Sequence, residues 1–539
     1  MTSSIIRPDA GFCPLSVNED LRLSERRREF DVDALCRLAA QSIGRSPQDV
    51  DTFVKLAEGG FNRIFLITMH DGFEMTARIP YPIMVPKLSA VASEVATMRF
   101  LRSSGLPVPE VYGYSPSPDN AAKTEYIFME YVRGTNLSDL WFELEETEIA
   151  SIMRQLAELE SHMMSISFPA GGSLYYTSDL EKVAGMKGIP LDKDEYFCVG
   201  PDVRIRMWLG RRSQLKVDRG PYKSPTAAIE SSARKELAYL EKFGRPLLPF
   251  RRERRESYEY QKQSPSDHVE NLERCLRVAP ILIRQLKPAL HQFCIRHPDI
   301  GPRNIIVSRL PDSQQLKLVS LIDWQNTSIL PLAFCAGVPD HLQNYDDPVS
   351  RELVPPTLPD NMNDLDENAQ SRALGVQHTR LVHFHYVKGT WEYNKRHRIS
   401  DALSDTVCML LFRLFHQAST QWEGETHDLK NTLIEITQMW PRVMGEGVPC
   451  PIAFDPEDLR QTEELNEKVQ LADENVKTLQ VGFGFGPDTW MPKERYDEVK
   501  DITDQLKRKV MISISEDREL KAKVEANWVL DDMDETDYE

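Results

Sequence analysis

The sequence predicts an α+β fold of two lobes, a small lobe built on five strands and a larger lobe that is mainly helical. Five runs of strand character lie between residues 53 and 132, around a single helical run. After Gly134, most periodic segments have helical spacing. The chain of 539 residues also exceeds the usual size of one hydrophobic core, so two lobes or domains are expected.

The small lobe is predicted over residues 31–132, after an N-terminal arm of residues 1–30 that has no clear period. A helix is expected at residues 30–43. The expected strands cover 53–58, 61–68, 73–79, 111–114 and 125–132, with Gly59-Gly60 and Asp71-Gly72 as turns between the first three. One further helix, at residues 89–101, follows the third strand and has apolar residues along one face.

The large lobe is predicted over residues 133–455. Helices are expected at 136–164, 233–243, 268–296, 404–417 and 429–439, and two short strands at 304–307 and 316–322. Residues 348–370, rich in proline, asparagine and aspartate, are predicted to form a long loop.

Residues 456–539 are predicted to form an acidic helical C-terminal extension. Charged helices at 455–477 and 493–528 flank a glycine-rich turn at 482–487, and residues 531–539 are expected to be disordered. The net charge is −18, and from Asp455 onward the chain has 24 acidic and 12 basic residues, a difference of −12. This acidity argues against non-specific nucleic-acid binding, while the extension offers a surface for a protein partner.

Composition also bounds the location of the protein. The eight cysteines are scattered without the spacing of a zinc site and are interpreted as reduced thiols. No apolar run approaches the ~18 residues of a membrane span. The prediction is a cytoplasmic protein. A mitochondrial location is the alternative, because residues 22–28 are rich in arginine although acidic residues lie nearby.

The motif with the clearest chemistry is His297-Pro-Asp299, with Asn304 five residues after the aspartate and Asp323 after two short strands. This is the H-x-D-x-x-x-x-N, then D, arrangement of kinases. In that arrangement Asp299 orients the acceptor hydroxyl, and Asn304 and Asp323 supply oxygen ligands to Mg²⁺. His297 is expected to brace the loop by hydrogen bonding. The alternative is that these residues only form turns beside the prolines.

A nucleotide site is predicted from the small lobe. Gly59 and Gly60 would let backbone N–H groups approach phosphates, helped by the Asn62 side chain, although a plain hairpin turn explains the glycines equally well. Arg78, 16 residues before Glu94, matches the ion pair that orients phosphates in kinases, with arginine in place of lysine. The alternative is a surface arginine and a solvated glutamate.

The segment Phe128-Met129-Glu130-Tyr131-Val132 fits the linker between the lobes. Backbone groups of Glu130 and Val132 are expected to pair with adenine, with apolar side chains such as Met129 against the flat base. An ordinary edge strand would have the same pattern, so this prediction depends on the position of the segment between the lobes.

With these residues, the chain resembles the aminoglycoside phosphotransferase family, in particular its large fungal branch, which includes proteins named for altered inheritance of mitochondria. The resemblance covers roughly residues 30–455 and is carried by the stretches 58–63, 77–80, 93–98, 128–131, 297–304 and 322–324. It implies a bilobal protein-kinase-like fold, ATP and Mg²⁺ as cofactors, and transfer of the γ-phosphate to a hydroxyl of a small-molecule acceptor.

The departures from protein kinases are specific. Asp323-Trp324-Gln325 stands where protein kinases have D-F-G, Gly301 stands where they have a lysine, and no A-P-E segment follows Asp323. A protein kinase is therefore the less favoured function. A non-catalytic nucleotide-binding or scaffold protein is the alternative, and the intact Asp299, Asn304 and Asp323 favour an active enzyme over it.

Three other groups of residues have two interpretations each. Asp202, Arg204, Arg206, Trp208 and Arg212 either line an acceptor site or, as we favour, form a structural salt-bridge cluster. The basic block of residues 251–255 is predicted to be a solvated helix rather than a polyanion signal. His383 and His385 are interpreted as packing residues rather than metal ligands, because no third ligand is nearby.

Overall fold

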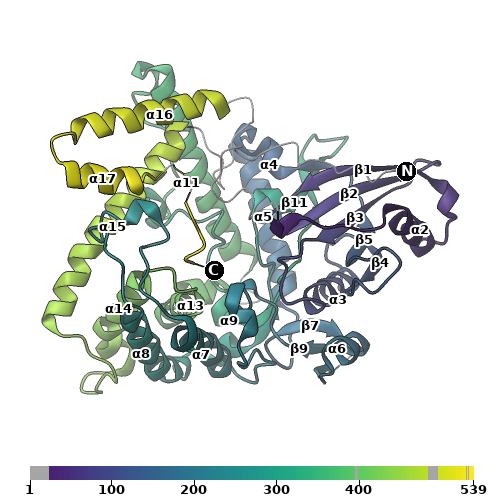
Figure 1. The fold of residues 1–539 in the computed structure, drawn as a ribbon, viewed down its shortest axis with the longest axis horizontal. Helices are drawn as coiled ribbons and strands as arrows, with labels where there is room; N and C mark the ends of the chain where they lie inside the picture. The colour runs from purple at the N-terminus through teal and green to yellow at the C-terminus, as the bar shows by residue number, and fades with distance from the viewer. Residues whose placement is uncertain are drawn as a thin grey trace.

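The computed structural model describes residues 24–192, 194–394, 399–483, 496–529, 531 and 533–538, and it shows two lobes (Figure 1). The purple strands of the small lobe lie on one side, and the helices of the large lobe fill the other. The α+β bilobal, kinase-like fold is therefore confirmed. Residues 1–23 of the predicted arm and the predicted turn from residue 484 onward lie outside the described residues.

The small lobe contains one antiparallel sheet of five strands in the order β1-β2-β3-β5-β4. Its strands are β1 Val50–Glu58, β2 Asn62–Met69, β3 Glu74–Pro80, β4 Val111–Ser115 and β5 Tyr126–Glu130. Helix α2 (Val32–Ser42) begins where the Asp31 side chain accepts a hydrogen bond from the N–H of Ala34, a typical N-cap. Its Leu35 packs with Phe65 and Phe128 of the sheet, so the five predicted strands and this helix are confirmed.

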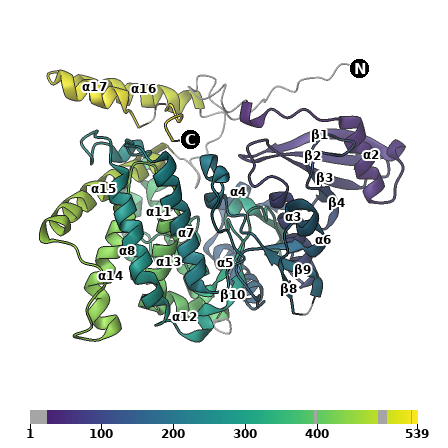
Figure 2. The same cartoon turned by 60° about the horizontal axis from the view of Figure 1, so that its bottom comes forward.

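The second helix of the small lobe, α3 (Ser89–Ser103), packs between the two lobes (Figure 2). Val95 and Met98 of α3 belong to the same buried cluster as Leu174 and Phe197 of the large lobe. Because α3 is buried along most of its length, Glu94 on it is 4% exposed and faces the junction of the lobes.

The large lobe consists of helices around short strands. Its helices are α4 Leu137–Leu140, α5 Glu146–Met164, α6 Thr177–Ala184, α7 Pro225–Phe243, α8 Pro265–Ile283, α9 Leu332–Cys335, α10 Pro348–Arg351, α11 Glu367–Tyr393, α12 Ile399–Ser404, α13 Thr406–Ser419 and α14 His427–Met444. Its strands are β6 Thr135–Asn136, β7 Ser173–Tyr176, β8 Ile189–Leu191, β9 Asp194–Gly200, β10 Phe293–Ile295, β11 Ile305–Arg309, β12 Leu316–Leu321 and β13 Ile329–Pro331.

Several predicted boundaries of the large lobe were wrong. The helix expected at 268–296 ends at Ile283, because Pro288 cannot continue it and the chain turns into strand β10. The helix expected at 136–164 is divided into α4 and α5 by a 3-10 turn at Trp141–Glu143. The loop expected at 348–370 contains α10 and the start of α11, which Asp366 caps. Strands β7, β8 and β9 form a sheet that was not predicted.

The described part of the C-terminal extension contains α15 Pro456–Phe483, α16 Tyr496–Ser513 and α17 Arg518–Ala526. Its helical character was predicted, but the helix expected at 493–528 is divided into α16 and α17. Figure 2 shows α16 and α17 along one face of the large lobe. Among the described residues, every helix of the chain is too short or too polar to span a lipid bilayer.

The basic block of residues 251–255 is not a solvated helix, which corrects the prediction. Arg254 is 5% exposed and donates two hydrogen bonds to Asp473 of α15, at 2.9 and 2.7 Å. Arg255 is 4% exposed and contacts Asn527, Met533 and Tyr538. The block therefore binds the acidic extension of its own chain.

Residues 531–539 were expected to be disordered, but the described residues among them contact the large lobe. The Tyr538 hydroxyl donates to the carbonyl of Leu248 at 2.8 Å, and its ring lies edge-on to Phe250, with centroids 5.1 Å apart. Opposite charge and apolar contact thus together hold the C-terminus on the segment 245–255.

We expect deletion of residues 527–539 to lower the melting temperature by a few degrees. The deletion removes three partners of the Arg255 guanidinium, whose contacts together contribute about 1–3 kcal/mol, or a few degrees in melting temperature. Thermal unfolding followed by circular dichroism measures the shift. An unchanged melting temperature would show that the tail contacts contribute nothing to stability.

Candidate active site

The loop that contains the H-x-D motif joins β10 to β11 and is anchored at its first residue. The guanidinium of Arg296 donates to Glu160 at 2.7 Å, to the hydroxyl of Tyr386 at 2.8 Å and to the carbonyls of Cys335 and Gly337 at 2.6 Å each. An arginine with so many partners fixes the start of the loop against the helical lobe.

His297 braces this loop, as predicted. Its Nε2 donates to the carbonyl of Ile322 at 2.9 Å, and its Nδ1 accepts from the N–H of Asp299 at 3.2 Å. Burial lowers the pKa of His297, so the ring is neutral with its proton on Nε2. The ring therefore links the loop to the segment that leads into Asp323 and is not placed to exchange protons.

Asp299 and Asn304 are brought together. The amide Nδ2 of Asn304 donates to the Asp299 carbonyl at 2.8 Å and to its carboxylate Oδ2 at 2.9 Å. The other carboxylate oxygen, Oδ1, lies 3.1 Å from Nε2 of His341. This hydrogen bond from His341 lowers the pKa of Asp299, and the side chain is 53% exposed. Asp299 is thus an ionised carboxylate that remains accessible.

Asp323 follows strand β12 in a left-handed backbone conformation, with φ of +64°. Aspartate is one of the few residues that tolerate this conformation, which is concentrated at functional sites. The next residue, Trp324, is fully buried, and its Nε1 donates to the carbonyl of Leu321 at 2.9 Å. The buried indole holds the turn, so the carboxylate of Asp323, 45% exposed, faces the gap between the lobes.

The predicted pairing of Arg78 with Glu94 is present as a buried ion pair, with side chains 6% and 3% exposed. A second nitrogen of Arg78 lies 2.7 Å from Oδ1 of Asp323. Burial raises the pKa of Glu94 to about 7 in spite of Arg78. Burial also acts to raise the pKa of Asp323, but the charge of Arg78 outweighs it and lowers that pKa. Arg78 therefore joins the small lobe to the candidate metal ligand.

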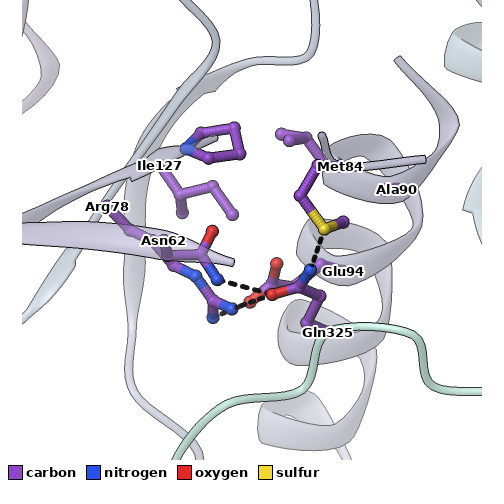
Figure 3. A pocket seen from close by; sticks show the side chains of 9 residues that line it. Asn62, Arg78, Met84, Ala90, Glu94, Ile127 and Gln325 are labelled. Carbon is purple, nitrogen blue, oxygen red and sulfur yellow. Dashed lines mark hydrogen bonds and ion pairs between the residues drawn. The ribbon is translucent and has the colours of Figure 1, made fainter. Parts of the chain in front are cut away.

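Gln325 completes this network. It is the last residue of the Asp323-Trp324-Gln325 stretch, but the sequence predicted no role for its side chain. Its Oε1 accepts from Arg78 at 2.6 Å and from Asn62 at 2.5 Å, and its amide nitrogen faces the sulfur of Met84. Figure 3 shows its carboxamide at the centre of a small pocket that Glu94 and Ile127 also line. Asn62 thus points inward to Gln325, which differs from the expected role beside the glycines.

Gly59 and Gly60 form the turn between β1 and β2, as predicted. A Cβ on Gly60 would meet no atom within 4 Å, and one on Gly59 would make only ordinary contact with the carbonyl of Asn62. Neither glycine has a positive φ. The protein's own packing therefore does not require them, and their small size leaves open space at the turn.

The base of the glycine turn is held by Glu58. Its carboxylate accepts from Arg63 at 2.7 Å, from the hydroxyl of Tyr81 at 2.6 Å and from Lys55 at 3.0 Å. Burial acts against the charged form, but these bonds prevail and lower the pKa of Glu58 to about 2. The turn thus projects from a fixed base.

The predicted linker is the end of β5, and its backbone is only partly available. The N–H of Glu130 donates to the carbonyl of Glu110 at 2.8 Å, and the carbonyl of Met129 accepts from the hydroxyl of Thr76 at 3.2 Å. Within the described chain, no residue hydrogen-bonds the backbone of Val132. The N–H of Glu130 is therefore already bonded to the protein, and the pairing of adenine with backbone groups of Glu130 and Val132 stays a prediction.

The other sequence candidates are structural. The carboxylate of Asp202 accepts from Arg204 at 2.7 Å and from Ser328 at 2.6 Å, and Arg212 forms a buried ion pair with Glu236. His383 is fully buried, and its Nδ1 accepts from the N–H of Asn344 at 3.1 Å. The favoured interpretations, a salt-bridge cluster and a packing histidine, are both confirmed.

The donor set fits a hard cation and a nucleotide. The amide nitrogen of Asn304 donates to Asp299, and Oδ1 of Asp323 accepts from Arg78. Among the described residues, no donor contacts the remaining oxygen of either side chain. Two carboxylate or carboxamide oxygens, with phosphates and water, are the ligands that Mg²⁺ prefers. Among the described residues, none hydrogen-bonds the backbone of Gly60 or Val132, and their contacts with phosphate and base stay predictions.

The chain is similar in sequence to several known proteins. Residues 52–334 match the phosphotransferase enzyme family, APH. A subtelomeric hrmA-associated cluster protein of Aspergillus fumigatus is 32% identical over 481 residues, which cover 81% of this chain and 89% of that protein. The altered inheritance of mitochondria protein 9, mitochondrial, of Yarrowia lipolytica is 25% identical over 511 residues, which cover 89% of this chain and 84% of that protein.

Among solved structures, ADP-bound aminoglycoside phosphotransferase APH(2'')-Ib is 14% identical with a TM-score of 0.35, and the match covers 75% of this chain and 97% of that one. The family match spans more than half of the chain, and the Aspergillus relative is similar over most of both proteins. The chain therefore belongs to the phosphotransferase enzyme family.

Proposed function

We propose that the protein transfers the γ-phosphate of ATP to a hydroxyl group of a small-molecule acceptor. The observation that carries the proposal is the linked set of Asp299, Asn304 and Asp323. The side-chain amide of Asn304 donates to the carboxylate of Asp299, and the backbone carbonyl of Asn304 accepts from the N–H of Ile322 at 3.0 Å. Ile322 directly precedes Asp323. Phosphoryl transfer needs mainly such positioning of charged groups.

In this proposal, Asp299 orients the acceptor and takes its proton. The acceptor oxygen forms a bond to the γ-phosphorus as the bond between that phosphorus and the bridging oxygen of ADP breaks, and the hydroxyl proton passes to the Asp299 carboxylate. The lowered pKa of Asp299 keeps it ionised before the step. Its half-exposed side chain leaves room for an acceptor.

Asn304 and Asp323 would hold Mg²⁺ through their remaining oxygens. When bound, the ion neutralises phosphate charge that otherwise opposes the attack of the acceptor. Arg78 binds both Glu94 and Asp323, and in this proposal its guanidinium would also contact phosphate oxygens when nucleotide is present. The glycine turn would cover the phosphates, and Val132 would bind the base.

The alternative function is nucleotide binding without catalysis, as in a scaffold protein. One observation favours it: the guanidinium of Arg78 already donates to Asp323 and to Gln325, so the protein's own side chains hold the group that would bind phosphate. The two functions differ in turnover, since a scaffold protein would bind ATP without releasing ADP.

We expect Asp323→Asn to weaken the binding of ATP in the presence of Mg²⁺ by more than about tenfold, because it removes a charged ligand of the ion. Asparagine keeps an oxygen that accepts from Arg78, so the fold should persist. Isothermal titration calorimetry of ATP binding, once with Mg²⁺ and once with EDTA, separates the affinity that depends on Mg²⁺ from the affinity that does not. Equal affinities of the variant and the wild type in Mg²⁺ would refute the role of Asp323 as a ligand.

The place of action is also a proposal. The Yarrowia lipolytica relative carries the word mitochondrial in its name. We retain the cytoplasm as the prediction for this chain and the mitochondrion as the alternative. Fractionation of cells that express the tagged full-length chain distinguishes the two.

A further inference from the structure

His341 lies against the catalytic carboxylate, although it is 42 residues away in the chain. Its Nε2 is 3.1 Å from Oδ1 of Asp299, while Asn304 donates to Oδ2 at 2.9 Å. Each carboxylate oxygen is therefore held by a different side chain. Two hydrogen bonds on opposite oxygens fix the plane of the carboxylate, which a single bond would leave free to rotate.

Gly301 makes room for the imidazole. A Cβ at this position would lie 2.7 Å from Cδ2 and 3.0 Å from Cγ of His341. The φ of Gly301 is −158°, an extended conformation that any residue adopts, so the backbone does not require glycine. The His341 ring is what excludes a side chain here. The position is also the one where protein kinases carry a lysine, so the imidazole occupies space that the missing side chain leaves.

The segment around His341 is fixed. Val338 and Leu342 are 6% and 2% exposed and pack in the main buried cluster of the large lobe with Tyr386 of α11. Two residues further on, the backbone of Asn344 is hydrogen-bonded to the buried His383. With its neighbours held in this way, the His341 side chain is 21% exposed and is presented to Asp299 by a rigid support.

We propose that His341 is a positioning residue for Asp299 in the phosphoryl transfer proposed above, on which this inference rests. Its Nε2–H holds Oδ1 so that the carboxylate keeps the orientation in which it meets the acceptor hydroxyl. Because His341 contacts Asp299, we expect it to act on the rate of transfer rather than on nucleotide binding.

The test compares His341→Ala, His341→Gln, Gly301→Ala and the double variant His341→Ala/Gly301→Ala, with exposed His70 replaced by alanine as the control. We expect His341→Ala to reduce the turnover number for Mg²⁺-dependent ATP hydrolysis about a hundredfold, the cost of a misplaced catalytic group, with the KM for ATP unchanged. The His341→Gln variant offers an amide N–H near the position of Nε2 and should restore part of the rate.

Gly301→Ala should also reduce the rate in the wild type, because it displaces the ring, but it should have no further effect once His341 is replaced by alanine. Equal effects of Gly301→Ala in both backgrounds would show that glycine does not act through the ring. A His341→Ala variant with the wild-type turnover number would overturn the proposal.

A second readout separates this inference from the proposed function. Crystal structures of the wild type and of His341→Ala show the orientation of the Asp299 carboxylate without any turnover. A carboxylate plane that is rotated in His341→Ala supports the positioning role even if the wild-type protein releases no ADP, in which case the proposed function alone fails. The same carboxylate plane in both proteins overturns the role of His341.

Discussion

Replacement of Asp299 by asparagine is expected to reduce Mg²⁺-dependent ADP release by about 10²–10⁴-fold, the contribution of a positioned general base. Asparagine has the shape of aspartate and can still accept a hydrogen bond from Asn304, so the loop should keep its conformation. It cannot take a proton from the acceptor. A coupled assay of ADP release, at saturating ATP, measures the loss.

The matched control is Asp312→Asn, the same change at an exposed position in the turn between β11 and β12. It should leave ADP release unchanged. Affinity for ATP should be the same in the wild type and in Asp299→Asn, because Asp299 is not a nucleotide contact. Full activity of Asp299→Asn would remove Asp299 from the proposed mechanism.

Replacement of Arg78 by methionine is expected to destabilise the protein by about 3–5 kcal/mol, the usual cost of an ion left buried without its partner. Arg78 and Glu94 are 6% and 3% exposed, and Arg78 also contacts Asp323 and Gln325. Urea unfolding at several pH values measures the free energy of unfolding.

The loss of stability in Arg78→Met should grow as the pH rises. The pKa of Glu94 is raised to about 7 in the folded protein, above its value in the unfolded chain, so folding favours the protonated form. Stability from this group is present at low pH and is lost as the pH rises through the folded pKa, which becomes higher still without Arg78. The double variant Arg78→Met/Glu94→Gln should regain stability at about pH 8, and a loss independent of pH would contradict the buried pair.

The sequence predicted most of the small lobe because its signals are local. Each strand from β1 to β5 has its own apolar run and turn, and α2, which Asp31 caps, begins two residues after the start of the predicted helix. The helix predicted over 268–296 overran because its apolar spacing continues past the end of α8, and only Pro288 marks the change. Strand β8, with three residues, is too short to show a period.

The site was predictable only where its residues lie in one motif. His297, Asp299, Asn304 and Asp323 are recognisable from spacing, and Arg78 with Glu94 from the order of strand and helix. The roles of His341 and Gln325 were missed because their partners are remote in the chain. Asp299 is 42 residues from His341, and Asn62 is 263 residues from Gln325. The burial of Arg254 and Arg255 depends in the same way on the C-terminal extension folding back, which the charge of the block alone does not show.

The most direct test of the proposed phosphotransferase is a screen of hydroxylated metabolites with ATP and Mg²⁺, read by ADP release and by phosphorus-31 NMR of the product. The wild-type protein is predicted to move the γ-phosphate to at least one acceptor hydroxyl, and Asp299→Asn to leave that acceptor unmodified. Binding of ATP without turnover on any acceptor, or an equal rate in Asp299→Asn, would contradict the proposal.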